Sequence, residues 1–173
     1  NKILGSSGLI LIEDNLIELT EGYRGQVSGD GVSGIQVSPQ ASPQEFFQAV
    51  HVRNNVLDHL GQDLVRWSTT DRIGTFTSTH PIAPIQIYRN GDGSVIEGNT
   101  VTNSYWAGIR VQRSNDSIIR DNLIQGEARD VAGNELVGLT STTAISMTDR
   151  LGSNETPRET GPYRVLRNRV EDL

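Results

Sequence analysis

The sequence predicts an all-β fold, a solenoid built as a right-handed parallel β-helix of about six coils with loop inserts. Three observations lead to this prediction: a short apolar–asparagine–apolar pattern recurs five times, equivalent positions lie 22 residues apart, and apolar and polar residues alternate within short segments. A period of about 20–50 residues is typical of solenoids, in which each unit buries its apolar face against its neighbours. Connections between parallel strands are right-handed as a rule, which gives the expected hand.

The recurring pattern places one apolar residue three positions before an asparagine and another two positions after it. Its copies are Ile12/Asn15/Ile17, Val52/Asn55/Leu57, Ile96/Asn99/Val101, Ile119/Asn122/Ile124 and Val165/Asn168/Val170. Asparagine tolerates the left-handed backbone conformation of a turn, and stacked side-chain amides can hydrogen-bond to one another in a ladder. We therefore expect Asn55, Asn99, Asn122 and Asn168 to be structural ladder residues rather than ligand contacts.

The repeat unit follows from the spacing of these copies. Asn55 and Asn99 are 44 positions apart, and Val65, Ile87 and Ile109 recur at intervals of 22 residues. Within a unit, alternation such as Ile85/Ile87 and Ile109/Val111 is typical of half-buried strands, and β-branched residues favour the extended state. The residues expected to point inward are Leu9, Leu11, Ile35, Val37, Val65, Ile87, Ile109, Val111, Ile145 and Met147.

Four inserts interrupt the coils, at residues 20–34, 38–47, 126–143 and 148–163. In solenoids such insertions form loops on one face, which is often the binding face. We expect residues 1–173 to form a single β-helix segment of a longer protein. Because the end of a solenoid exposes unpaired backbone, flanking domains or self-association are expected to cover the two coil ends.

Composition narrows the classes of partner. The formal charge is −6 and the sequence contains no cysteine. An acidic chain lacks the clustered lysine and arginine of a nucleic-acid surface, and without cysteine there is no disulfide framework or thiolate metal site. No run of about 18 apolar residues exists, so no membrane span is expected.

One cluster of outward residues carries the functional prediction. Alignment by the 22-residue period places Arg66, Tyr88 and Arg110 at the same outward position, and adjacent coils lie about 4.8 Å apart. A guanidinium on each side of a tyrosine suits an anionic sugar, because arginine holds a carboxylate bidentately and an aromatic ring can stack on a sugar. The aromatic residues expected to bind substrate nearby are Trp106, Tyr105 and Trp67. The structural alternative is an arginine–tyrosine stack that only covers the sheet.

Two stretches resemble a known superfamily. VIEGNTVTNSYWAGIRVQRSNDSIIRDNLIQG, residues 95–126, and VHVRNNVLDHLGQDLVRW, residues 50–67, resemble the repeats of right-handed parallel β-helix proteins of the pectate-lyase-like superfamily. Its members include polysaccharide lyases, polygalacturonases, mannuronan C5-epimerases and phage tail depolymerases. The resemblance implies a carbohydrate-active protein that is extracellular or at the cell surface.

The same resemblance gives little support for a metal site or for glycoside hydrolysis. Asp58-His59 is similar to an Asp-His pair of pectate lyases in which Asp58 would face calcium, but the other calcium carboxylates have no counterparts. No metal or cofactor is therefore expected, with calcium the weaker alternative. The Asp-Pro-His, Gly-His-Gly and Arg-x-Lys motifs are missing, and no outward carboxylate pair lies in register at the roughly 6.5–9.5 Å that inverting hydrolysis needs. Glycoside hydrolysis is disfavoured.

These observations predict a domain that acts on an acidic polysaccharide as a lyase or a C5-epimerase. Arg66 or Arg110 would neutralise the uronate carboxylate, and Tyr88 would exchange the proton at C5. Two alternatives stay open, a non-catalytic carbohydrate-binding solenoid and a structural β-solenoid of a surface or secreted protein.

Overall fold

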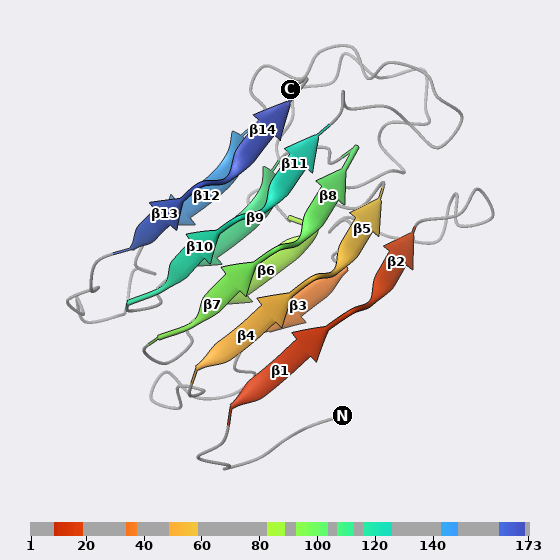
Figure 1. Ribbon diagram of the computed structural model, residues 1–173. Coiled ribbons are helices and arrows are strands. Elements are labelled where there is room, and N and C mark those ends of the chain that lie inside the picture. Colours follow the sequence, from red (N-terminus) through yellow and green to blue (C-terminus); the bar gives the residue numbers. More distant parts are fainter. Residues whose placement is uncertain are drawn as a thin grey trace, which may run out of the picture.

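The computed structural model describes residues 9–18, 34–37, 49–58, 83–88, 93–103, 107–112, 116–125, 143–148 and 163–171. Within these residues the chain contains only short strands and no helix, and the strands form three sheets in which every pairing is parallel. Figure 1 shows the strands stacked side by side in the same direction, with β1 (Ile10–Glu13) and β2 (Leu16–Glu18) at one end of the stack and β13 (Arg164–Leu166) and β14 (Arg169–Glu171) at the other. The all-β prediction is confirmed, and the arrangement is that of a parallel β-solenoid.

The chain visits the three sheets in turn, so each of the first four levels of the stack contributes one described strand to each sheet, and the fifth contributes β13 and β14 to sheets 1 and 2. Sheet 1 contains β1 (Ile10–Glu13), β4 (Val50–Arg53), β7 (Val95–Glu97), β10 (Ile118–Arg120) and β13 (Arg164–Leu166). Sheet 2 contains β2 (Leu16–Glu18), β5 (Val56–Asp58), β8 (Thr100–Thr102), β11 (Leu123–Gln125) and β14 (Arg169–Glu171). Sheet 3 contains β3 (Ile35–Val37), β6 (Ile85–Tyr88), β9 (Ala107–Gln112) and β12 (Thr143–Thr148), and lies behind the other two in Figure 1.

The step between successive levels is less regular than predicted. β4 pairs directly with β7, with His51 opposite Val95, so the 44 residues between these two positions make a single step. The prediction of two 22-residue units in this interval is wrong, and Val65 lies outside the described residues. The next step, from Val95 to Ile118, is 23 residues. The described strands form five levels, where the sequence predicted about six coils.

The core consists of apolar rows that run across the levels, one residue per strand. Sheet 1 contributes the row Ile12, Val52, Ile96, Ile119 and Val165; sheet 2 contributes Ile17, Leu57, Val101, Ile124 and Val170; and sheet 3 contributes two rows, Ile35, Ile85, Ile109 and Ile145, and Val37, Ile87, Val111 and Met147. The middle members of these rows are fully buried. Burial of these rows, at about 25 cal/mol per Å² of apolar surface, is the main force that holds the levels together.

Most of the predicted inward residues lie in these rows, but the first strand is an exception. Leu9 and Leu11 are 54% and 44% exposed, so their prediction as inward residues is wrong. Ile10 and Ile12 pack against the core instead, and Leu11 faces outward opposite His51. Met147 belongs to an inner row but is 42% exposed, because β12 is an edge strand of sheet 3. A shift of one residue exchanges the two faces of a strand.

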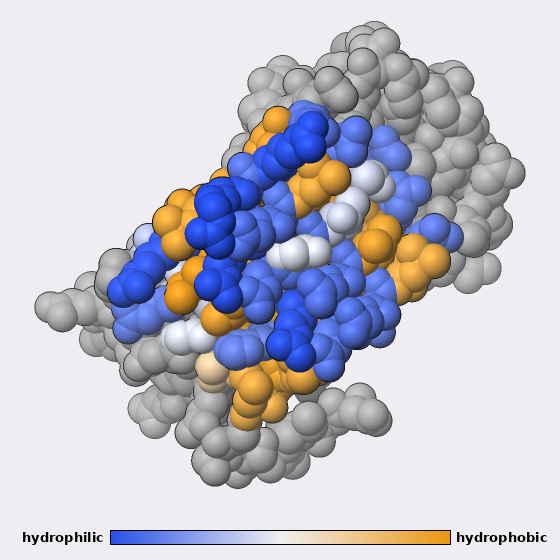
Figure 2. Space-filling model, in the orientation of Figure 1, coloured by the Kyte–Doolittle hydropathy of each residue, from blue (hydrophilic) through white to orange (hydrophobic). Residues whose placement is uncertain are grey.

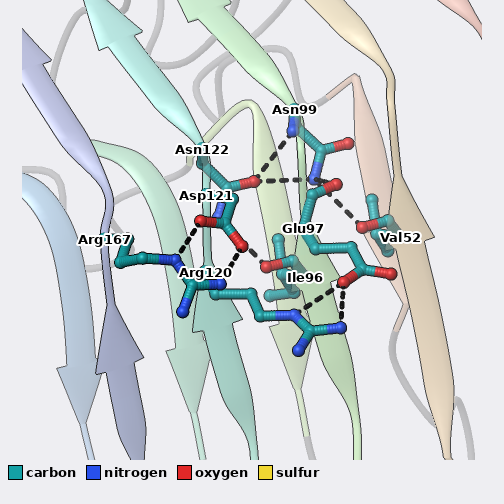
Figure 3. Close-up of polar contacts among 8 residues, drawn as sticks. All are labelled: Val52, Ile96, Glu97, Asn99, Arg120, Asp121, Asn122 and Arg167. Carbon is teal, nitrogen blue, oxygen red and sulfur yellow. Dashed lines mark hydrogen bonds and ion pairs between the residues drawn. The ribbon is translucent and has the colours of Figure 1, made fainter.

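The asparagine ladder is confirmed. Each side-chain Nδ2 donates to the Oδ1 of the asparagine one level on, at 2.8 Å from Asn15 to Asn55, 2.9 Å from Asn55 to Asn99, 2.9 Å from Asn99 to Asn122 and 2.8 Å from Asn122 to Asn168. The backbone N–H of each donor residue reaches the same oxygen at 3.0–3.1 Å. The central part of the ladder, drawn in Figure 3, is buried between sheets 1 and 2. It satisfies polar groups that would otherwise be unpaired in the core.

The left-handed conformation occurs one residue before each ladder asparagine. Asp14, Asn54, Gly98, Asp121 and Arg167 have φ between 51° and 64°. Sequence reasoning had linked this conformation to the ladder asparagines themselves. Four of the five residues carry a Cβ, and three of these are Asp or Asn, the residues that accept this backbone most readily after glycine.

Gly98 provides a test of this turn. An added Cβ would lie 2.7 Å from Oδ1 of Asn54, whose exposed side chain can rotate away, so backbone strain should dominate. We expect Gly98→Ala to lower the free energy of unfolding by about 1–2 kcal/mol. Gly98→Asn should lower it less, because asparagine tolerates positive φ. Urea denaturation of both variants measures the difference, and equal losses would show that the contact with Asn54 decides instead.

Candidate functional site

The outer face of sheet 3 holds the described part of the predicted site. Two outward rows cross this face in register: Gln36, Gln86, Arg110 and Ser146 form the first, and Tyr88 and Gln112 form the second. Gln36 is exposed, whereas the side chains of Gln86, Tyr88, Arg110 and Gln112 are half-buried. Strand spacing of about 4.8 Å makes the first row roughly 14 Å long.

The predicted column of Arg66, Tyr88 and Arg110 is wrong in its register. Arg110 lies opposite Gln86, and Tyr88 lies opposite Gln112, because β6 and β9 pair with an offset of 24 residues instead of 22. The described neighbours of β6 are β3 and β9. Arg66, Trp67, Tyr105 and Trp106 lie outside the described residues.

Strand β9 owes its position to close packing beneath it. A Cβ on Gly108 would come within 2.8 Å of Cγ2 of Ile124 and 3.2 Å of the carbonyl oxygen of Ala144. Glycine therefore lets β9 lie directly against the core residue Ile124. Ile109 and Val111 then point inward with no exposed surface, and alternation sends Arg110 to the outer face between them.

The electrostatics of this face centre on Arg110. Burial lowers the pKa of the Arg110 guanidinium, and the nearby Tyr88 phenol acts in the opposite direction. The two side chains are therefore near enough for the charge of one to act on the other, although they stand in different rows. A guanidinium with part of its hydration removed offers stronger electrostatic attraction to an anion than one in bulk water.

Gln86, the register partner of Arg110, adds a second polar feature. Its Oε1 is buried, and no hydrogen-bond donor reaches it in the part of the chain that the structure describes. A buried amide oxygen without a donor is unusual in folded proteins.

The described outer rows of sheet 3 contain no aspartate or glutamate. In the described residues, no group of three or more histidine, cysteine, aspartate or glutamate side chains is placed to hold a metal ion. Asp58, the residue that resemblance linked to calcium, accepts hydrogen bonds through Oδ1 from the Thr102 hydroxyl and from Asn103 Nδ2, the latter at 2.9 Å. His59 lies outside the described residues.

Sheet 1 carries a charged row that sequence reasoning missed. Glu13, Arg53, Glu97 and Arg120 face outward at successive levels with alternating sign. Arg120 Nε lies 2.7 Å from Glu97 Oε2, and Arg53 pairs in the same way with Glu13, whose hydrogen bond and charge raise the pKa of Arg53. Figure 2 shows the face formed by sheets 1 and 2 as largely hydrophilic, and Figure 3 shows the Arg120 pair.

The signal for this row was present in the sequence. Each of these four charged residues directly follows the first apolar residue of the repeated pattern, so alignment on the asparagines brings them together. Because the row neutralises its own charges, it offers no net field to a ligand. Its role is to hold the strands in register, since opposite charges side by side are favourable and like charges are not.

No protein-family model matches the chain, and neither the curated proteins nor the solved structures yield a significant match. Within the described residues there is no helix of the length and apolar character that a membrane crossing requires.

Proposed function

We propose that the chain is a β-helix domain, right-handed and of the pectate-lyase-like type, that binds an acidic polysaccharide on the outer face of sheet 3. The observation that carries this proposal is the half-buried Arg110, which lies in register with Gln86 and interacts with Tyr88. We place the protein outside the cell or at its surface, where such polymers occur.

The chemistry of the face fits a uronate. The Arg110 guanidinium would hold the carboxylate through two parallel hydrogen bonds. The Tyr88 ring offers an apolar surface beside a polar phenol. The described outer rows of sheet 3 carry no carboxylate to repel the polymer.

A catalytic form of the same site is the second candidate, favoured by the interaction between Tyr88 and Arg110. Arg110 would neutralise the uronate carboxylate and so stabilise the carbanion that forms at C5. Tyr88 would act as the base that takes the C5 proton. In a lyase the electron pair would form the C4–C5 double bond as the C4–O bond breaks, and the departing oxygen would take the proton from the Tyr88 phenol. In an epimerase a water molecule would return a proton to the opposite face of C5, and its hydroxide would take the proton from Tyr88.

Replacing Arg110 with glutamine tests the binding site. We expect the affinity for a polyuronate to fall by about 1–3 kcal/mol, roughly 5- to 150-fold, which is the usual size of a charge-assisted hydrogen bond. Isothermal titration calorimetry measures the change. Arg164→Gln is the matched control, because it removes the same charge from an exposed residue of sheet 1. Unchanged affinity in Arg110→Gln, or an equal loss in the control, would contradict the site.

Replacing Tyr88 with phenylalanine separates binding from catalysis. A binding domain keeps the ring and most of its affinity, so calorimetry should show little change. An enzyme that uses the phenol loses turnover with little change in binding. Products that absorb in the near ultraviolet identify a lyase, and a changed uronate composition without cleavage identifies an epimerase. If the wild-type protein yields neither ultraviolet-absorbing products nor a changed uronate composition, it is a binding domain without catalysis.

A further inference from the structure

Three arginines on the face of sheets 1 and 2 are held in the same way. Each donates a hydrogen bond from its Nε to a carboxylate that lies beside it in the level before, at distances of 2.5, 2.7 and 2.7 Å. The pairs are Arg53 with Glu13, Arg120 with Glu97, and Arg167 with Asp121. Figure 3 draws the second and third pairs. In this fold an acceptor one level earlier therefore orients an outward arginine through its Nε.

Arg110 has an amide at the place where these arginines have an acid. Its register partner in the level before is Gln86, on β6. Glutamine and glutamate have the same length and shape, so the amide reaches as far as the glutamates of sheet 1 do. The amide oxygen accepts a hydrogen bond as a carboxylate oxygen does, but the amide carries no charge.

Both atoms that this geometry would join are withdrawn from water. Gln86 Oε1 and Arg110 Nε are buried, although each side chain as a whole is only half-buried. Because no donor from the described residues reaches Gln86 Oε1, a hydrogen bond to this oxygen would remove an unfavourable feature of the structure. The Nε–H group of Arg110 is the donor that the strand register places beside it.

The kind of partner changes the electrostatics of the arginine. The hydrogen bond and the charge of Glu13 raise the pKa of Arg53. Asp121 raises the pKa of Arg167 for the same reasons. The pKa of Arg110 is instead lowered, mainly by burial.

The partners of Arg110 in the two neighbouring strands are neutral. They are Gln86 on one side and Ser146 on the other, whereas Arg53 lies between two glutamates in sheet 1. The register neighbours of Arg110 therefore do not cancel its charge. That charge is what an anionic ligand would bind.

We propose that Gln86 is the positioning residue of the site and that its neutral amide sets the preference for an acidic ligand. When a carboxylate engages Arg110, Gln86 Oε1 accepts the Nε–H group and fixes the plane of the guanidinium, which leaves both terminal amino groups for the ligand. Gln86 acts through Arg110 and does not touch the ligand, since its oxygen is buried. This role rests on the proposed binding of an acidic polysaccharide at Arg110.

Gln86→Glu keeps the shape of the side chain and adds a charge. The introduced carboxylate would pair with Arg110 as the glutamates of sheet 1 pair with their arginines, so the affinity for polygalacturonate or alginate should fall at least about fivefold. Gln125→Glu is the matched control, because it makes the same change at a half-buried residue of sheet 2. Calorimetry should show nearly unchanged affinity for the control.

Gln86→Met keeps the size and the net charge and removes the acceptor. The guanidinium is then held less firmly, so affinity should fall about three- to tenfold. Urea denaturation should show no loss of stability, because methionine replaces a buried oxygen that has no donor among the described residues. A glutamine with a merely structural role would give the reverse, a less stable protein with unchanged affinity.

A double-mutant cycle tests the contact without a ligand. If Gln86→Glu places its carboxylate against Arg110, then Arg110→Gln should destabilise that variant more than it destabilises the wild-type protein. Equal losses of stability in the two backgrounds at neutral pH would show that the side chains do not meet, and would overturn the proposal.

The binding results separate this proposal from the proposed function. A wild-type protein that binds neither polymer contradicts the proposed function and the ligand-binding role of Gln86 together, while the cycle still decides the contact. If the wild type binds and Arg110→Gln loses affinity, but both Gln86 variants keep it, the site stands and the role of Gln86 is wrong. Far-ultraviolet circular dichroism verifies each fold. If Gln86→Glu does not fold, the affinity and stability of Gln86→Met decide.

Discussion

Replacing Ile109 with aspartate should unfold the protein. Ile109 is fully buried in β9, with Ile85 and Ile145 on either side in the same row. The substitution places a carboxylate in an apolar core without a partner, which costs more than the roughly 5–15 kcal/mol by which a domain of this kind is stable. Circular dichroism should show the loss of the strand spectrum at neutral pH.

The control for this experiment is Gln112→Asp, on the outer face of the same strand. It introduces the same side chain where water and polar neighbours are available, so the fold should persist. A folded Ile109→Asp variant that melts like the wild type would show that β9 does not lie in the core.

Replacing Asn99 with alanine should have the second largest effect. Asn99 Nδ2 donates to the carbonyl oxygens of Val52 and Glu97 and to Asn122 Oδ1, and Asn99 Oδ1 accepts from the backbone and side-chain nitrogens of Asn55. Alanine leaves several buried groups unpaired at about 1–3 kcal/mol each, so we expect a loss of at least about 3 kcal/mol. Chemical denaturation measures it.

Asn15→Ala is the matched control at the exposed end of the ladder. Asn15 Nδ2 donates to Asn55 Oδ1 and to the Glu13 carbonyl, Asn15 is itself exposed, and its backbone N–H also reaches Asn55 Oδ1 and remains in the variant. Its replacement should cost about 1 kcal/mol or less, because water can satisfy the groups that remain. Equal losses at the two positions would mean that the ladder contributes little beyond its local turns.

The fold could be predicted from sequence wherever a pattern was local. The asparagine and its two apolar neighbours recur at constant spacing, so one short template located all five asparagines, four of which were predicted to form the ladder; Asn15 extends it. The alternation of inward and outward residues was predicted wrongly in the segment of Leu9, Ile10, Leu11 and Ile12. Four consecutive apolar residues do not show which of them point inward. The pairing of Ile10 with Val50 decides it, and pairing is a tertiary property.

Connection length limited the prediction elsewhere. Val65 lies 22 residues before Ile87, so a long connection gave the same spacing as an additional coil. Only the direct contact of β4 with β7 distinguishes the two. Spacing alone cannot separate an insert from a repeat when the insert has the length of the repeat.

The candidate site was predicted in part for the same reason. Alternation correctly placed Arg110 on the outer face, between Ile109 and Val111. Its neighbour on the next strand depends on the offset between paired residues of β6 and β9. That offset is 24 residues, two more than the assumed period, so Gln86 occupies the place expected for Tyr88. Side chains from different coils are brought together by register, which a constant period does not reveal.

The binding of a polyuronate, compared with the same polymer after esterification of its carboxyl groups, tests the proposed function most directly. Esterification keeps the sugar rings and hydroxyls and removes the charge that Arg110 would bind. We predict that the wild-type protein binds the acidic polymer, that this binding weakens as salt screens charges within about 8 Å at physiological ionic strength, and that the esterified polymer binds at least about tenfold more weakly. Equal binding of the two polymers, or binding of neither, would contradict an acidic-polysaccharide site on sheet 3.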